Sequence, residues 1–342
     1  MIGTRLLRPI LGVVLSIVCL ALLARPVFLG DVSLDDVVAS LRSADPAVLV
    51  PAIALYFVGT LVRSIRWQAL LARRHLGLGL LFRTLVIGLM VNDLLPARVG
   101  ELARALLLAR NGSVPVGTSL ASILVERILD GLALTALLGV SIVMVGADSS
   151  LVQLAGAAGV VFVGAFAVII CAAALPDLSR RAARALLRPL PSRWEMRLAG
   201  FTDAVVDGLR PMARPATAVQ VLALSLLAWA VEGSMYVVIL AGFQIPGGLA
   251  AAFMGAAVAN LATLVPSAPG YIGTFDLALQ AVLTGVFAAP AAAAAGATLV
   301  VHLALVLPVV VAGLFFLWRE DLTLTDLHRR PRSAEGASIA GR

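Results

Sequence analysis

The chain alternates long apolar runs with short polar segments, a pattern that predicts helices crossing a membrane. A membrane-spanning helix needs about 20 consecutive, mostly apolar residues. Six runs reach that length, and we interpret the first as a retained span, not as a cleaved signal peptide. The expected spans cover residues 9–29, 47–65, 115–146, 151–175, 216–242 and 292–317.

Two further apolar regions are broken by polar residues, proline and glycine before either half reaches the length of a span. Residues 80–110 contain the interruption NDLLPARVGELAR, and residues 250–288 contain VPSAPGYIGTFD. Both regions share the spacing Leu-x-Pro-x-x-x-Gly. Non-helical backbone at membrane depth is tolerated only where protein or a water-filled cavity surrounds it, so these breaks indicate a functional interior.

Composition places the chain among polytopic membrane proteins. Of its 342 residues, 61% are hydrophobic and 13% are charged, and the mean hydropathy is +1.03. Soluble globular chains are about 45–50% apolar and 25% charged, so a soluble fold is excluded. We expect an all-α membrane domain over residues 1–318, followed by a basic, disordered tail at 319–342.

The charged residues predict the topology. All 26 basic side chains are Arg, and the net charge of +7 comes from a few segments between the apolar runs. Cytoplasmic loops of membrane proteins carry such an excess, so the charge does not indicate a nucleic-acid partner. Both termini, the loop after residue 65 and the basic loop 177–215 are therefore expected on the cytoplasmic side. The acidic segment 31–45 and the Arg-free segment 146–150 are expected outside.

This topology makes both broken regions re-entrant. Residues 80–110 would enter from the cytoplasmic side and return to it, and residues 250–288 would do the same from outside. The alternative, in which each arm is a full span, stays open at this point. With the hairpins, the halves 1–150 and 151–318 resemble an inverted repeat, in which the substrate site lies near the membrane midplane at the broken helices.

The interruption NDLLPARVGELAR carries the first candidate site. A new helix after Pro96 and Gly100 would present free N–H groups and a partial positive charge, which suit an anion. Arg98 and Arg104 would add guanidinium groups that bind phosphate through paired hydrogen bonds. The competing interpretation is internal pairing, because Glu101 and Arg104 are i, i+3 neighbours.

A second constellation, SILVERILDGLAL, lies inside the span at 115–146. Glu126 and Asp130 share one face of the helix, and Arg127 lies close to Asp130. Charges inside an apolar run must face the bundle interior or a wet cavity. They would balance the charge of a bound head group, or they would form a structural ion-pair network; both interpretations stay open.

Other polar residues carry weaker signals. Arg63 and the pair Arg66-Trp67 lie where the second span ends, and we expect them to anchor it at the membrane surface. The remaining ionisable candidates, for a cavity lining or for proton coupling, are Glu232, Asp276 and His302. A lone histidine in a span is, however, more often a hydrogen-bonded core residue.

The second interruption supplies the opposing hairpin tip. Its proline and glycine residues break the helix, and its polar groups are candidates for contacts with the substrate. These residues are Pro266, Ser267, Gly270 and Gly273. The sequence contains no Walker loop, GxSxG element, His/Cys metal spacing or dinucleotide fingerprint. We therefore expect no catalytic residue, no metal and no cofactor.

Four segments, in this order, resemble the flippase-like membrane region of bacterial lysyl-phosphatidylglycerol synthases and their stand-alone relatives. They are RSIRWQALL, NDLLPARVGELARALLLA, SLASILVERILDGLAL and LVPSAPGYIGTFDLAL, within a likeness that covers residues 10–318. The resemblance implies a protein of the bacterial cytoplasmic membrane that moves lipid head groups between leaflets. The matching positions are Asn92, Pro96, Arg98, Gly100, Glu101, Arg104, Glu126, Arg127, Asp130, Pro266, Pro269, Gly270 and Gly273.

The chain departs from the bifunctional synthases, which carry a soluble aminoacyltransferase domain after the membrane region. The sequence ends soon after Trp318, so we expect no lipid synthesis by this chain, and a separate enzyme would supply the lipid. The implied substrate is an anionic, aminoacylated or polyprenyl-phosphate-linked lipid. A small-solute or proton-coupled transporter and a membrane-embedded lipid-modifying enzyme stay open as alternatives. The sequence does not determine the oligomeric state.

Overall fold

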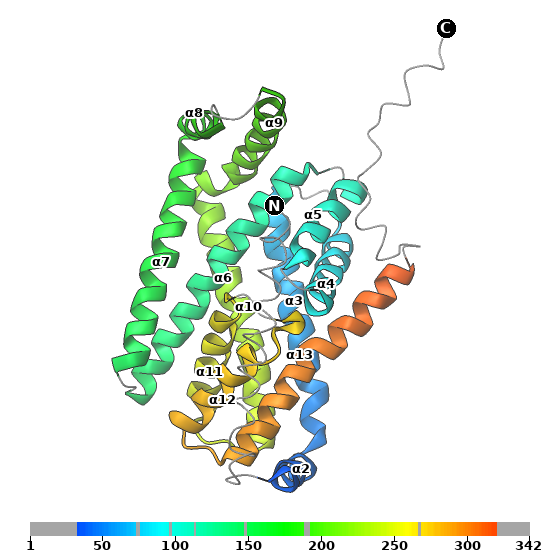
Figure 1. Cartoon of the computed structure of the whole chain (residues 1–342), viewed down its shortest axis with the longest axis vertical. Coiled ribbons are helices and arrows are strands. Elements are labelled where there is room, and N and C mark those ends of the chain that lie inside the picture. Colours follow the sequence, from blue (N-terminus) through cyan, green and yellow to red (C-terminus); the bar gives the residue numbers. More distant parts are fainter. Residues whose placement is uncertain are drawn as a thin grey trace.

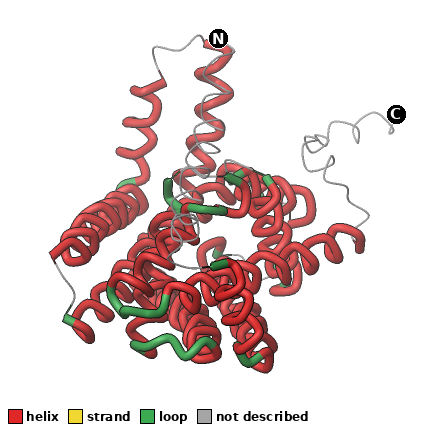
Figure 2. The backbone as a smooth tube through the Cα atoms, turned by 60° about the horizontal axis from the view of Figure 1, so that its bottom comes forward, coloured by secondary structure: helices red, strands yellow, loops and turns green. Residues whose placement is uncertain are grey.

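The fold is all-α in the part of the chain that the structure describes, and no strand occurs there (Figure 2). The structure is a computed structural model. It describes residues 33–72, 76–95, 98–112, 114–146, 149–187, 192–265 and 268–319. The predicted span at 9–29 and the tail beyond residue 319 lie outside the described residues.

Within the described ranges, five helices are long and apolar enough to cross a membrane, and they match five of the predicted spans. A short 3-10 turn, η1 (Pro46–Val48), leads into the first of them. The chain is thus an all-α polytopic membrane protein. The five helices are α3 (Leu49–Leu71), α6 (Val116–Val145), α7 (Ser149–Ala174), α10 (Pro215–Gly242) and α13 (Ala291–Arg319).

A hairpin of short helices stands at each of the two interruptions. The first hairpin is α4 (Leu78–Leu94) with α5 (Val99–Gly112), and the second is α11 (Gly248–Ala262), η3 (Pro269–Tyr271) and α12 (Thr274–Gly285). Seventeen residues, the length of the longest arm, rise about 26 Å, less than a hydrocarbon core of about 30 Å. In Figure 1 the first hairpin occupies the upper half of the molecule and the second the lower half.

Glycine allows the arms of the first hairpin to touch along their backbones. A methyl group added at Gly100 would lie 1.9 Å from the carbonyl oxygen of Gly88, and one added at Gly88 would lie 2.2 Å from a side-chain carbon of Arg104. Arg98 has a left-handed backbone with φ of 54°, and it leads the chain into α5. Pro96 lies outside the described residues.

Left-handed residues also shape the tip of the second hairpin. Gly270, Tyr271 and Gly273 have φ angles of 66°, 58° and 88°, and together they reverse the chain before α12. Pro266 and Ser267 lie outside the described residues. Three left-handed residues within four positions keep this tip out of helical geometry, so its main-chain carbonyls and amides are not all used within a helix.

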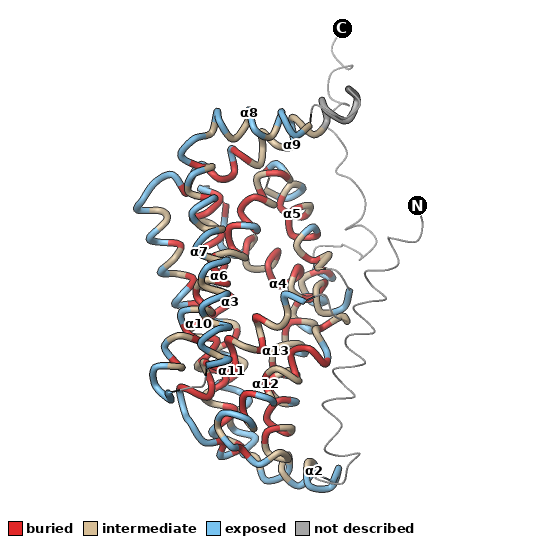
Figure 3. Tube along the Cα trace, turned by 60° about the vertical axis from the view of Figure 1, so that its left-hand side comes forward, coloured by how far each residue is buried: buried red, intermediate tan, exposed pale blue. Residues whose placement is uncertain are grey.

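Shorter helices cap the two ends of the bundle. α2 (Leu34–Ser43) lies at one end, and α8 (Pro176–Leu187) and α9 (Ser192–Leu209) lie at the other, followed by η2 (Arg210–Ala213) (Figure 1). The predicted basic loop is therefore largely helical. α8 has no buried residue (Figure 3), whereas α9 packs on α6, where Gly117 admits the side chain of Ala204.

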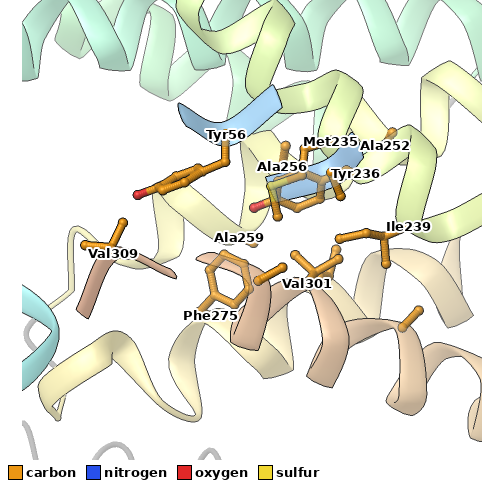
Figure 4. Close-up of a cluster of buried hydrophobic side chains, with 14 of the residues drawn as sticks. Tyr56, Met235, Tyr236, Ile239, Ala252, Ala256, Ala259, Phe275, Val301 and Val309 are labelled. Atoms are coloured by element: carbon orange, nitrogen blue, oxygen red, sulfur yellow. The ribbon is translucent and has the colours of Figure 1, made fainter. Parts of the chain in front are cut away.

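The largest hydrophobic cluster joins α10, the second hairpin and α13 (Figure 4). Small side chains on one face of α11, Ala252, Ala256 and Ala259, are fully buried and let the neighbouring helices approach closely. Tyr56 and Phe275, at the edge of this cluster, also line the cavity described next. Packing in this hydrophobic core therefore holds the second hairpin in position next to that cavity.

Candidate functional site

The tips of the two hairpins touch in the interior of the bundle. A guanidinium nitrogen of Arg98 donates a hydrogen bond to the main-chain carbonyl of Thr263 at 2.9 Å. A methyl group added at Gly270 would lie 3.4 Å from the carbonyl oxygen of Asp93. The guanidinium of Arg98 also lies 5.7 Å from the ring centre of Tyr271. Residues about 165 positions apart therefore form one junction.

A polar cavity of about 140 Å³ lies at this junction. The long helices α3, α6, α10 and α13 supply its other walls. Basic and acidic residues are equally frequent in the lining, so the cavity is highly charged but close to neutral as a whole. Its charged residues are Arg63, Arg66, Arg98, Arg127, Asp93, Glu126, Asp130 and Glu232.

Arg66 corrects the prediction that the end of the second span anchors at the membrane surface. Its side chain is 1% exposed, and it donates to Asp130 at 2.6 Å and to Ser225 at 2.8 Å. Trp67 is fully buried and donates its indole N–H to Ser122. The helix continues to Leu71, so these residues lie inside the bundle and not at its edge.

Arg63 makes the second tight pair, and its expected role as an anchor is likewise wrong. One of its guanidinium nitrogens lies 2.6 Å from Oε2 of Glu232. The guanidinium also stacks over Trp229 at 4.7 Å, and the indole N–H of Trp229 donates to Asp130 at 3.0 Å. Glu232 therefore lines the cavity, and its charge is already matched by Arg63.

Arg104 lies behind the cavity wall and does not line it. Its side chain is 2% exposed, lies 2.9 Å from Oε2 of Glu126 and stacks on Trp67 at 4.2 Å. The expected pair between Glu101 and Arg104 is not among the contacts of the described residues. Arg104 thus ties the first hairpin to α6, and we correct the expectation that it reaches a phosphate directly.

Glu101 lies between two arginines that line the cavity. Its carboxylate is 3.8 Å from Arg98 and 3.6 Å from Arg127, distances that leave both pairs loose. Arg127 also lies 3.5 Å from Asp130. The side chain of Arg98 is 28% exposed, compared with 1% for Arg66. Arg98 and Arg127 are therefore the cations of this site that a ligand reaches most easily.

The helix N-termini at the tips are already occupied. The N–H of Gly100 donates to the side-chain oxygen of Asn92 at 2.8 Å, and the N–H of Gly273 donates to Asp276 at 2.9 Å. The expectation of free N–H groups at these two positions is therefore wrong. Asn92 and Asp276 cap the second arms of their hairpins and fix the tips in place.

His302 connects the second hairpin to α13. Its Nδ1 lies 2.5 Å from Oδ1 of Asp276, and its Nε2 lies 2.9 Å from the carbonyl oxygen of Gly270. The ring of Phe275 packs against the imidazole edge to face, with centres 5.1 Å apart. His302 lines the polar cavity as well, so it is not a simple core residue.

A second, apolar cavity of about 560 Å³ adjoins the polar one between α12 and α13. Ile272, Leu299 and Leu303 line it, and all three are exposed on the outside of the bundle. This cavity therefore opens laterally, on the outer surface of the helix bundle. The residues that line both cavities are Asp93, Gly270, His302 and Val306.

The sequence did not single out several residues of this site. Asp93 lines both cavities, and Tyr271, Thr263 and Trp229 line the polar one. Asp93 could have been found, because it lies inside the quoted interruption. Nothing local marks Trp229 or Thr263 as site residues. No group of three His, Cys, Asp or Glu residues in the described ranges is arranged to hold a metal ion.

Comparisons with known proteins give the family. Residues 10–313 match the profile of the lysylphosphatidylglycerol synthase transmembrane region. The chain is 28% identical over 330 residues to a protein of Haloferax volcanii named glycosyltransferase AglD, covering 86% of this chain and 52% of the relative. The chain thus spans about half the length of this curated relative. No solved structure matches.

Proposed function

Because the chain belongs to the family of the lysylphosphatidylglycerol synthase transmembrane region, we propose that it moves a lipid between the leaflets of the cytoplasmic membrane. The observation that carries this proposal is that a charged cavity and a lateral apolar one adjoin each other. A lipid translocator needs both, because the head group requires a polar path while the acyl chains stay in the bilayer. The two cavities share four wall residues.

The lateral cavity is the place for the acyl chains. It is about four times larger than the polar cavity, 560 Å³ against 140 Å³. Its exposed leucines, Leu299 and Leu303, stand on α13. Burying a chain segment against such residues contributes about 0.8 kcal/mol per methylene group relative to water, but little relative to lipid. The cavity therefore guides a lipid without trapping it.

The polar cavity is the place for the head group, and Arg98 with Arg127 would hold its phosphate. Both guanidinium groups have only loose ion pairs. Arg98 lies 3.8 Å from Glu101, and Arg127 lies 3.6 Å from Glu101 and 3.5 Å from Asp130. Guanidinium groups bind phosphate oxygens in pairs. Ligand pockets usually measure about 300–1,000 Å³, so the cavity suits a small head group, and a polyprenyl-linked glycan requires the hairpins to separate.

Membrane placement follows from charge in this proposal. The end that carries α8 and α9 would be cytoplasmic because it holds the basic segment, and the end that carries α2 would face outside. The two hairpins would then enter from opposite sides as re-entrant elements. Both chain termini would lie in the cytoplasm, and a separate enzyme would supply the lipid.

The test is lipid exchange in liposomes that contain the purified protein. Fluorescent analogues of phosphatidylglycerol, aminoacylated phosphatidylglycerol and a polyprenyl phosphate are placed in both leaflets, and dithionite quenches the outer pool. We expect the protein to move at least one of them into reach of dithionite faster than protein-free liposomes do. If it accelerates none of the three, the proposed function is wrong.

The alternatives predict other outcomes. A small-solute transporter needs a cavity sealed from lipid, and the lateral cavity argues against it. A lipid-modifying enzyme is suggested by the name of the relative, glycosyltransferase. Such an enzyme would leave a lipid of changed mass in the liposome extract, whereas a translocator returns the lipid unchanged. We propose that this chain is not an enzyme.

A further inference from the structure

His302 stands at the boundary between the polar cavity and the lateral one. It lines both cavities, and so does Gly270, the residue whose carbonyl oxygen faces its Nε2 at 2.9 Å. This contact therefore joins two walls of the boundary, one on α13 and one on the tip of the second hairpin.

The two contacts of the imidazole ring require one proton on Nε2 and a second proton between Nδ1 and Oδ1 of Asp276. A main-chain carbonyl only accepts hydrogen bonds, so Nε2 must carry hydrogen to bond Gly270. Nδ1 faces Oδ1 of Asp276, whose other oxygen accepts from the N–H of Gly273. The proton between Nδ1 and Oδ1 is therefore shared by the His302–Asp276 pair. When this shared proton is lost, the neutral imidazole has one N–H only and the carboxylate has none, so one of the two contacts is lost.

From this geometry we infer that His302 is a proton-operated latch between the two cavities. The latch is the pair of contacts that His302 makes with Asp276 and Gly270. With the proton bound, both contacts hold and the hairpin tip stays against α13. When the proton leaves, one contact is lost, the tip is released and the boundary opens. Its use in lipid transport rests on the proposed function, but the latch itself does not.

The groups around His302 favour this role. Asp276 on α12 and the Gly270 carbonyl in η3 face it directly. Asp93 on α4 lines both cavities and has no ion pair with a described residue, so it can receive the released proton. The other titratable groups that line the polar cavity come from η3, from the first hairpin and from the long helices, and Glu232 among them is paired with Arg63. They are Tyr271, Tyr56, Arg63, Arg66, Arg98, Glu126, Arg127, Asp130 and Glu232. The charges of α2 lie near the start of α13, where Ser40 meets Gly296.

A spectroscopic experiment tests the protonation state without any lipid movement. The chain has two other histidines, His75 and His328, and their replacement by Gln leaves His302 as the single histidine of the full chain. Nitrogen-15 NMR of the imidazole should show a proton on Nε2 and a proton shared between Nδ1 and Asp276 at pH 7. An Nδ1 without this shared proton at that pH overturns the latch.

A labelling experiment tests the opening. Leu305 lines the polar cavity alone and Leu303 the lateral cavity alone, so each is replaced by Cys in a chain with Cys19→Ser and Cys171→Ser. A membrane-soluble maleimide is applied between pH 5 and 9, and the ratio of labelling at 305 to that at 303 cancels the pH dependence of the thiol. At pH values below the midpoint at which the latch loses its proton, we expect this labelling ratio to rise about tenfold per pH unit, because the deprotonated fraction of the latch rises by that factor. A ratio independent of pH overturns the proposal.

Two variants separate the latch from an unrelated pH effect. In Asp276→Asn the amide N–H₂ donates to a neutral Nδ1 while Nε2–H keeps its bond to Gly270, so the ratio should stay low at every pH. In His302→Gln one contact is lost, so the ratio should stay high. If Asp276→Asn retains the wild-type rise, the latch is wrong. These results are independent of whether any lipid is translocated, so the latch and the proposed function fail separately.

Discussion

Arg66 on α3 and Asp130 on α6 form a buried ion pair, with Nη1 of the arginine 2.6 Å from Oδ1 of the carboxylate. Asp130 also accepts from the indole N–H of Trp229 on α10, and Arg66 also donates to Ser225 on the same helix. One pair of charges therefore connects three of the long helices. These contacts form the rigid frame against which the two hairpins meet.

Asp130→Asn should destabilise this frame strongly, because it leaves the charge of Arg66 buried without a full counter-charge. Removing one partner of a buried pair typically costs about 3–5 kcal/mol. We expect a large fall in the thermal unfolding temperature of the detergent-solubilised protein, measured by intrinsic fluorescence. The control is Asp177→Asn, which removes an exposed carboxylate on α8 and should leave that temperature nearly unchanged. Equal effects of the two substitutions would contradict a structural role for Asp130.

Gly100→Ala should force the arms of the first hairpin apart. The added methyl group would lie 1.9 Å from the carbonyl oxygen of Gly88, a backbone atom that cannot move alone. Overpacking of this kind costs about 1–3 kcal/mol. Gly139→Ala in α6 is the matched control, because nothing lies within 4 Å of its added methyl group. We expect a lower unfolding temperature for Gly100→Ala only; a neutral result would refute the close packing of α4 on α5.

Arg98→Ala should slow lipid exchange in liposomes while the protein remains folded. A hydrogen bond to a charged group is worth about 1.5–3 kcal/mol, which corresponds to a roughly 10- to 150-fold change. Arg98→Lys should retain part of the activity, because lysine keeps the charge but loses the paired geometry. The control is Arg181→Ala on exposed α8. If exchange by Arg98→Ala equals that of the control, the head group does not bind at this tip.

The topology of the hairpins is open to direct labelling. Position 111 ends the first hairpin and position 288 follows the second, and both are exposed. In the cysteine-free chain, Ala288→Cys should react with an impermeant maleimide on intact spheroplasts, and Asn111→Cys should react only after permeabilisation. The reverse pattern, or equal labelling, would contradict re-entrant entry from opposite sides.

Much of the fold could be read from the apolar runs. Five predicted spans coincide with long helices, and a hairpin of short helices stands at each interruption. The reason is that a helix in lipid must satisfy all its backbone hydrogen bonds internally, so length and polarity alone define it. The same constraint made the interruptions conspicuous, and it placed Arg98 and Gly270 at tips before any tertiary contact was known.

The partners of the charges were decided by tertiary structure alone. The sequence placed Arg63 and Arg66 at a membrane surface and offered Glu101 as the partner of Arg104, because it records only neighbours along the chain. In the folded protein Arg66 pairs 64 residues away, and Arg104 pairs with Glu126. A buried charge is stable only where an opposite charge from another helix reaches it. Sequence therefore determined which residues could not face lipid, and packing determined which of them, including His302 and Asp93, line both cavities.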